Sequence, residues 1–391
     1  MRKLCEPETM RIAVFSGNYN YVKDGANQAL NRLVARLETR GVGVRVYSPV
    51  SKTPAFEPAG TLVPVPSLPI PGRGEYRFAL GLPAAQSRDL ANFAPSLVHL
   101  SAPDWLGHAA KSWARKNNIP AIASVHTRFE TYFDYYHAGY ARRIIERILR
   151  SFYSGLDEIY APSESMATVL REANYATQVE LWSRGVDHHI FSPQARSLAW
   201  RRSLGIADDM PVILFVARLV LEKGLDVLAE VGAELARRNV RHRLLVVGDG
   251  PARGWIAERL PDAIYTGFLT STDLGCAYAS SDIFFNPSIT ETFGNVTLEA
   301  MASGLPVVAA AATGSSSLVE DQVTGRLTPP CDIAAFVDAL EHYAVDADAR
   351  AAAGAAGHAR ALPYDWDRIN DVVIERYQQL VTATRARSGS G

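Results

Sequence analysis

The sequence predicts an α/β protein with two domains, each built on an open, doubly wound parallel sheet. Three observations lead to this class. The chain has 391 residues, which is too long for one ordinary core and suits two domains. Apolar runs of strand length recur between segments with helical periodicity, as is typical of buried parallel strands. Near residue 190 this alternation breaks off, and it then starts again.

The first half begins with an apolar strand at 11–16, a polar loop that contains glycine, and a helix at 27–40 with apolar residues at helical spacing. This strand, loop and helix form the building block of a parallel sheet. Segment 49–74, rich in Pro and Gly, is expected to be a long surface loop. The later strands of this half are predicted at 44–47, 97–100, 121–125 and 158–161.

The second half repeats this alternation, with a helix predicted at 225–237 and the body of another helix at 298–303. Its strands are predicted at 212–217, 244–247, 263–267, 282–286 and 306–310. Both halves are therefore expected to be Rossmann-like, with domains at 1–190 and 191–367. Open parallel sheets bind ligands at the carboxyl ends of their strands, and we expect the two domains to face each other across one cleft.

Composition excludes several classes of protein. The net charge is −1, so no global field indicates a nucleic-acid partner. The three cysteines, Cys5, Cys276 and Cys331, lie far apart without metal-ligand or disulfide spacing, which fits a reducing cytosolic compartment. The apolar runs are too short to span a bilayer, and Met1–Met10 has no apolar core of a signal peptide.

The most informative stretch is Glu291–Val308, in which Glu291 and Glu299 stand eight residues apart around a helix start. Eight helical residues rise ~12 Å, whereas the acid and nucleophile of a retaining glycosidase lie ~5 Å apart. The two carboxylates are therefore expected to have separate tasks. Glu291 can contact a hydroxylated ligand, and Glu299 a deeper part of it such as a ribose. Two solvated acids on an ordinary helix are the alternative.

The start of this helix offers a place for an anion. Phe293, Gly294, Asn295 and Val296 are expected to present backbone N–H groups there, as helix N-termini do for phosphates.

Two cations follow the strand at 212–217. Arg218 and Lys223 can bind a phosphate group there, Arg with a bidentate fork and Lys as a point charge. The alternative for both is an ordinary surface salt bridge.

Other single residues carry weaker signals. Gly25, in the first strand-to-helix loop, allows close approach to a phosphate or sugar, although a simple turn explains it equally well. Gly248 and Gly250 are fully explained by a turn that ends a strand. His126 follows a strand end and is expected to face the cleft, while a structural, hydrogen-bonded histidine is the alternative.

Glu291–Val308 resembles the signature of the retaining glycosyltransferases of family four, which have the GT-B fold. Val216–Gly224 resembles the basic phosphate-binding loop of that family. Leu244–Pro251 and Thr266–Leu269 resemble the segments around the nucleotide base, which assigns Gly248, Gly250, Gly267, Phe268 and Leu269 to donor binding.

Three further segments resemble the same family. Ser124–Tyr132 resembles the His-Thr motif of the N-terminal domain, and Arg184–Phe191 the linker between domains. Tyr364–Trp366 resembles the end of the second domain, before a last helix at about 368–385 that packs back on the first. In place of the Gly-Gly doublet of many members, the first loop has Asp24-Gly25-Ala26-Asn27.

The resemblance implies transfer of a hexose or hexuronic acid from a nucleotide-diphosphate sugar, with a UDP-sugar favoured and GDP-mannose possible. It implies catalytic roles for His126, Arg218, Lys223 and Glu291. No cofactor and no metal are expected, since the basic loop takes the place of a cation and the Asp346-Ala-Asp348 triplet lies in a charged helical stretch.

One segment bears on the acceptor. Residues 141–153 form a basic amphipathic stretch, and aromatic side chains at 132–140 precede it. A helix that packs on the core is the simpler interpretation. The other is contact of Arg142–Phe152 with an anionic membrane, which gives a lipid acceptor at the inner membrane face and a cytoplasmic, peripheral location. Extension of a surface polysaccharide is the alternative, and another paired-Rossmann enzyme (epimerase or phosphorylase) or a nucleotide-sugar sensor would share the architecture.

Overall fold

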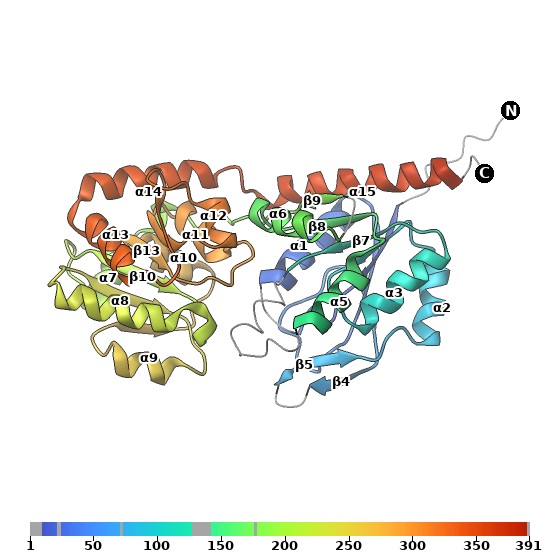
Figure 1. Ribbon diagram of the computed structural model, residues 1–391, viewed down its shortest axis with the longest axis horizontal. Coiled ribbons are helices and arrows are strands. Elements are labelled where there is room, and N and C mark those ends of the chain that lie inside the picture. The colour runs from blue at the N-terminus through green and yellow to red at the C-terminus, as the bar shows by residue number, and fades with distance from the viewer. Residues whose placement is uncertain (1–9, 22–24, 71–72, 127–141, 176–177, 389–391) are drawn as a thin grey trace. The chain divides into compact units, whose positions relative to one another are not determined.

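The computed structural model describes residues 10–21, 25–70, 73–126, 142–175 and 178–388. The chain divides into two compact units. The first unit combines the chain up to Ser183 with the segment from Trp366 onward, and the second runs from Arg184 to Asp365. In Figure 1 each unit shows a central sheet with helices on both faces.

The first unit contains, in its described residues, a seven-stranded sheet whose neighbours all run parallel. The order of the strands reverses direction between β1 and β6, which is the switch point of a doubly wound sheet. In sheet order the strands are β3 (Thr61–Pro64), β2 (Gly43–Ser48), β1 (Arg11–Phe15), β6 (Leu97–Leu100), β7 (Ala121–Ser124), β8 (Glu158–Ala161) and β9 (Val179–Leu181).

Helices connect these strands, and a separate antiparallel hairpin follows β3. The hairpin consists of β4 (Ser67–Ile70) and β5 (Arg73–Ala79). The helices in the described part of this unit are α1 (Gly25–Thr39), α2 (Ala84–Phe93), α3 (Trp105–Lys116), α5 (Arg142–Tyr153), α6 (Glu164–Ala173) and the long α15 (Trp366–Ser388).

The second unit repeats this design with a six-stranded parallel sheet, whose switch point lies between β10 and β13. In sheet order its strands are β12 (Ile264–Gly267), β11 (Arg243–Val247), β10 (Val212–Val216), β13 (Ile283–Asn286), β14 (Val307–Ala310) and β15 (Gly325–Thr328). Its helical segments are η2 (Pro193–Ala195), α7 (Leu198–Ser203), η3 (Leu221–Lys223), α8 (Leu225–Arg237), α9 (Arg253–Arg259), α10 (Ser271–Ala279), α11 (Asn295–Ala302), α12 (Thr313–Leu318), α13 (Ile333–Val345) and α14 (Ala347–Ala361).

Alternation along the strands creates a core on each face of both sheets. Ala13 and Phe15 of β1 belong to one cluster, and Ile12 and Val14 to the cluster on the other face. Burial on both faces explains why these strands read as continuous apolar runs. The two Rossmann-like parallel-sheet domains predicted from the sequence are thus confirmed, while their arrangement across a cleft stays a prediction.

The C-terminal helix α15 belongs to the first unit and packs against α1 (Figure 1). Its Ile374 and Tyr377 are buried in the core beside β1. Arg36 of α1 makes a two-bond ion pair with Asp371, with distances of 2.8 and 2.6 Å. Arg376 donates a 2.7 Å hydrogen bond to the buried carboxylate of Glu158.

Two expectations need correction. Segment 49–74 contains β3, β4 and the start of β5, where a long loop was expected. Pro64 stands at the end of the edge strand β3, a position that tolerates proline. The second unit begins at Arg184 and not at residue 191, because Val186 and Phe191 are buried in its core.

Candidate active site

The loops that follow β10, β11 and β12 lie against one another at the carboxyl edge of the second sheet. Leu219 donates a 3.0 Å backbone hydrogen bond to the carbonyl of Asp249, and Gly248 a 2.8 Å bond to that of Gly267. Three of the sequence-predicted segments are therefore adjacent, at the edge where open parallel sheets bind their ligands.

Glycine is required twice in this arrangement. Gly248 has φ +129°, and a Cβ atom there would lie 1.9 Å from the Ala217 carbonyl oxygen. A Cβ atom on Gly250 would lie 2.5 Å from the Leu219 carbonyl oxygen. Both distances are too short for a side chain. These glycines therefore do more than form a turn, because they allow the loop after β11 to lie directly against the loop after β10.

Lys223 and Glu291, 68 positions apart in the chain, meet directly. The Nζ atom of Lys223, at the end of η3, lies 2.6 Å from Oε1 of Glu291, and both side chains are partly buried. The backbone of Glu291 is held as well, because Gly314 of α12 donates a 2.9 Å hydrogen bond to its carbonyl oxygen. This pair is a preformed charge pair beside the strand ends.

Helix α11 begins as the sequence predicts, one turn after Glu291. Gly294 is the N-cap residue with φ +93°, and no side chain caps the N-terminus of the helix. Asn295 and Val296 occupy the first turn, while the Phe293 side chain is buried just before it. An uncapped N-terminus leaves backbone N–H groups that suit an anion.

Glu299 lies inside α11 and accepts a 3.0 Å hydrogen bond from the hydroxyl of Tyr278 in α10. Burial raises the pKa of the Glu299 carboxyl to about 7, and the bond from Tyr278 lowers it by less. Burial also raises the pKa of the Tyr278 hydroxyl well above its usual value, with further increases from Glu299 and Glu291. The two glutamates thus act electrostatically on one hydroxyl group.

Two predicted residues lie at the surface of these loops, and a third is partly buried. Arg218 is exposed, and within the described residues no ion pair or hydrogen bond engages its guanidinium. Phe268 follows Gly267, which has φ +74°, and is 70% exposed. Leu269 is partly buried against the core. A free cation and an exposed aromatic ring at a strand edge are available to a phosphate and a base.

The remaining predicted residues belong to the first unit. His126 follows β7 and is partly buried, with its Nε2 atom 2.9 Å from the hydroxyl oxygen of Ser124. Gly25 is the first residue of α1. Residues 127–141, which include the aromatic side chains at 132–140, lie outside the described residues.

The amphipathic stretch forms α5, but its apolar residues divide into two groups. Leu149 and Phe152 are buried in the core, as the simpler interpretation required. Ile144 and Ile148 are 61% and 45% exposed, next to the exposed Arg143. The described apolar residues of α5 are therefore divided between the core and the surface. No helix in the described part of the chain is long and apolar enough to cross a bilayer.

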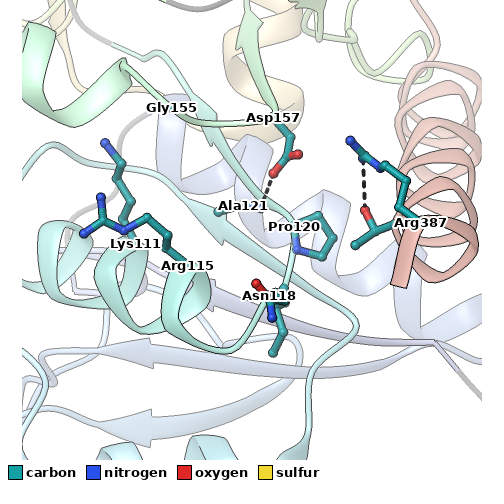
Figure 2. Close-up of a pocket in the computed structure, with 10 residues that line it drawn as sticks. Lys111, Arg115, Asn118, Pro120, Ala121, Gly155, Asp157 and Arg387 are labelled. Carbon is teal, nitrogen blue, oxygen red and sulfur yellow. Dashed lines mark hydrogen bonds between the residues drawn. The ribbon is translucent and has the colours of Figure 1, made fainter. Parts of the chain in front are cut away.

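A cavity of 350 Å³ in the first unit lies away from the predicted residues (Figure 2). It is bordered by Pro120 and Ala121, at the amino end of β7, whereas His126 follows the carboxyl end. Lys111 at its rim donates hydrogen bonds to three carbonyl oxygens at the end of α5, and Asp157 accepts one from the Ala121 amide at 2.9 Å. Lys111 and Asp157 therefore connect structural segments of the first unit.

Sequence reasoning missed two polar partners of the predicted residues. Tyr278 sits in a helix with no motif around it, so only the tertiary structure places it against Glu299. Ser124 stands two residues before His126 and shares its face of the chain, a relation that the period of a strand could have revealed.

The two parallel-sheet units and the family models that the chain matches identify a glycosyltransferase of the GT-B class. Residues 23–190 match the model described as Glycosyltransferase Family 4, and residues 210–346 match that of Glycosyl transferases group 1. The chain belongs to glycosyltransferase family 4.

Individual relatives support this assignment. The chain is 32% identical to a GDP-mannose-dependent alpha-mannosyltransferase of Mycolicibacterium smegmatis, over 95% of this chain and 98% of that one. It is 25% identical to an alpha-monoglucosyldiacylglycerol synthase of Streptococcus pneumoniae, over 81% and 75%. Among solved structures, a sucrose-phosphate synthase of Thermosynechococcus elongatus shares the fold with a TM-score of 0.80 at 21% identity, covering 96% of this chain and 100% of that one.

Proposed function

We propose that the protein moves a hexose or hexuronic acid from a nucleotide-diphosphate sugar to a lipid acceptor, with retention at the anomeric carbon. The observation that carries this proposal is the Lys223–Glu291 pair at the carboxyl edge of the second sheet, 2.6 Å apart. The donor binds to the second unit and the acceptor to the first.

The chemistry follows from charge. As the bond between the anomeric carbon and the phosphate oxygen breaks, negative charge grows on the diphosphate, and preorganised cations stabilise that charge. Lys223 and Arg218 supply the positive charge, with the uncapped start of α11 beside Glu291. Glu291 binds a sugar hydroxyl, and Glu299 the ribose. The acceptor hydroxyl attacks on the face from which the diphosphate leaves, and its proton passes to a departing phosphate oxygen.

A lipid acceptor is supported by the surface of α5. Its exposed Ile144 and Ile148 stand among the exposed Arg143, Arg147 and Arg150. A helix with apolar and basic side chains on its free surface suits the interface of an anionic bilayer. The Streptococcus pneumoniae relative is named for a diacylglycerol product, in line with a lipid acceptor here. We place the protein peripherally at the inner membrane face.

Transfer assays test the proposal. Radiolabelled UDP-glucose and GDP-mannose are incubated separately with the protein and a bacterial lipid extract, and the product is examined by NMR for its anomeric configuration. The expected result is a glycolipid from one donor, with the α-configuration of that donor retained. An inverted product contradicts retention. Labelled polysaccharide without labelled lipid contradicts the lipid acceptor, and no transfer from either donor contradicts the proposed donor class.

A further inference from the structure

A chain of hydrogen bonds connects His126 with the C-terminal helix through the interior of the first unit. The Nε2 atom of His126 lies 2.9 Å from the Ser124 hydroxyl oxygen. That oxygen lies 2.8 Å from Nε2 of His99 on β6, and Nδ1 of His99 lies 2.8 Å from the hydroxyl oxygen of Tyr377 on α15. Hydrogen bonds therefore connect four side chains, one each from β6, β7, α15 and the loop after β7.

The interior part of this chain is closed to water. His99 and Tyr377 are fully buried, and Ser124 is buried as well. Trp182 packs edge-on against both imidazoles, with ring centroids 5.8 Å from each. Trp182 is held in turn by a 3.2 Å hydrogen bond to Asn370 of α15. The imidazole rings are thereby fixed in position.

Burial also fixes the charge of His99. It lowers the pKa of the imidazole to about 3, so His99 is neutral at physiological pH and has one N–H donor and one acceptor nitrogen. The two possible directions of the chain differ at its inner end, where His99 Nδ1 is the partner of the Tyr377 hydroxyl.

If His99 carried its proton on Nδ1, it would donate to Tyr377, and the phenol proton would have no acceptor among the described residues. An unsatisfied buried donor costs ~1–3 kcal/mol. In the other direction the protons of Tyr377, His99 and Ser124 all have acceptors. Tyr377 donates to Nδ1 of His99, His99 donates from Nε2 to Ser124, and Ser124 donates to Nε2 of His126.

We infer that Ser124, His99 and Tyr377 are positioning residues that keep the proton of His126 on Nδ1 and orient its ring. This inference rests on the proposed function for its catalytic meaning, because the family resemblance implies a catalytic role for His126 in sugar transfer. A histidine whose second nitrogen is held by a fixed partner presents one tautomer to its ligand. The C-terminal helix α15 thereby contributes to the reaction through Tyr377, although this side chain is buried.

The tautomer is measured directly by long-range proton–nitrogen NMR on protein labelled with nitrogen-15 histidine, without ligand and above neutral pH. His126 and His99 are assigned by their loss in His126→Gln and His99→Gln. The expected spectrum shows His126 protonated on Nδ1 and His99 protonated on Nε2. A wild-type His126 protonated on Nε2 would overturn the inference.

Variants test the connection. Ser124→Ala removes the donor to His126 and is expected to shift its protonation toward Nε2, while Tyr377→Phe has the same effect to a smaller extent. Tyr160→Phe is the matched control, because Tyr160 is a buried tyrosine beside Tyr377 (ring centroids 5.9 Å apart) whose hydroxyl bonds to Glu158 instead. If Tyr160→Phe and Tyr377→Phe changed the protonation of His126 equally, a specific effect of the hydrogen bonds that start at Tyr377 would be contradicted.

Kinetics complete the test. With the donor that supports transfer, Ser124→Ala is expected to lower kcat about tenfold with little change in the KM of the donor, the effect of one hydrogen bond that acts in the transition state. An unchanged kcat in Ser124→Ala with a changed tautomer would overturn the positioning role. If the wild-type protein transfers no sugar at all, the proposed function fails, while the tautomer is still decided by the spectra.

Discussion

The residues that the structure describes at the carboxyl ends of the two sheets differ in their chemistry. In the second unit, charged groups predominate, with the Lys223–Glu291 pair partly buried and Arg218 exposed. In the first unit, His126 ends a chain of neutral hydrogen-bonded side chains that leads into the core. The same doubly wound design therefore supports a site for charge on one sheet and a site for a directed hydrogen bond on the other.

Under the proposed function, this difference corresponds to the needs of the two substrates. A diphosphate carries negative charge that grows during transfer, and fixed cations stabilise it. An acceptor hydroxyl is neutral and needs orientation. We therefore assign the donor to the second unit and the acceptor to the first, and the following predictions either break this assignment or make it more specific.

The largest expected effect is the loss of charge at the donor edge. Lys223→Ala should lower kcat/KM by about 10²- to 10³-fold, the usual result of removing one preorganised group that stabilises transition-state charge. Thermal unfolding should shift by only a few degrees, since the pair is partly exposed. The control Arg241→Ala removes an exposed ion pair with Asp209 in the same unit and should leave the rate unchanged. Comparable rates for the two variants would refute the role of Lys223.

The loop contacts of the donor edge give the next effect. Gly248→Ala should destabilise the protein by ~2–3 kcal/mol, because its Cβ atom would lie 1.9 Å from the Ala217 carbonyl oxygen at a left-handed φ. Gly254→Ala is the matched control, since a Cβ atom at this position in α9 has open space around it, and it should stabilise by ~0.5–1 kcal/mol. Denaturant unfolding measures both. A Gly248→Ala protein as stable as the wild type would contradict the close contact.

The acceptor side is tested at α5. Exchanging both Ile144 and Ile148 for Asp should weaken binding to vesicles of equal parts phosphatidylglycerol and phosphatidylcholine at least about tenfold, because two apolar side chains no longer enter the interface. Val345→Asp, at an exposed apolar residue of the second unit, serves as the control in the same sedimentation assay. Equal vesicle binding by the wild type and the α5 variant would contradict a contact between α5 and the membrane.

The smallest effect concerns pH. The pKa of Glu299 is raised to about 7 in the folded protein, against ~4.3 in an unfolded chain. Between these two pKa values the folded protein keeps a proton on Glu299 that the unfolded chain releases. The protonated Glu299 therefore adds to the free energy of unfolding below pH ~4.3, and this contribution is lost as the pH rises through about 7. Calorimetry should show a Tm that falls across this window in the wild type and falls less in Glu299→Gln. Glu230→Gln, at an exposed glutamate, is the control and should show the wild-type change of Tm with pH. An equal change of Tm with pH in the wild type and in Glu299→Gln would contradict the raised pKa of Glu299.

Much of the fold could be predicted from local sequence. Strands buried on both faces, such as β6 and β8, have the predicted bounds because their apolar runs end abruptly. The edge strands β3, β9 and β15 were missed, since an edge strand needs no continuous apolar run and β3 lies in a segment rich in Pro and Gly. The hairpin β4–β5 was missed for the same reason.

The site was predictable only where a motif is local. The relation of Glu291 and Glu299 to the start of α11 is a matter of sequence spacing, and the structure places both as expected. The contact of Lys223 with Glu291 and that of Tyr278 with Glu299 depend on which strands lie side by side. The chain from His126 to Tyr377 joins residues 251 positions apart, from the numbers 126 and 377, and no pattern of spacing indicates it.

The central claim is that the charged edge of the second sheet binds the nucleotide diphosphate. Isothermal titration of UDP and of GDP into the wild-type protein and into Lys223→Ala tests it directly. The account predicts that one of the two nucleotides binds the wild type and binds Lys223→Ala at least about tenfold more weakly, a loss of ~1.4 kcal/mol. Binding of neither nucleotide, or equal binding to both proteins, would contradict the account.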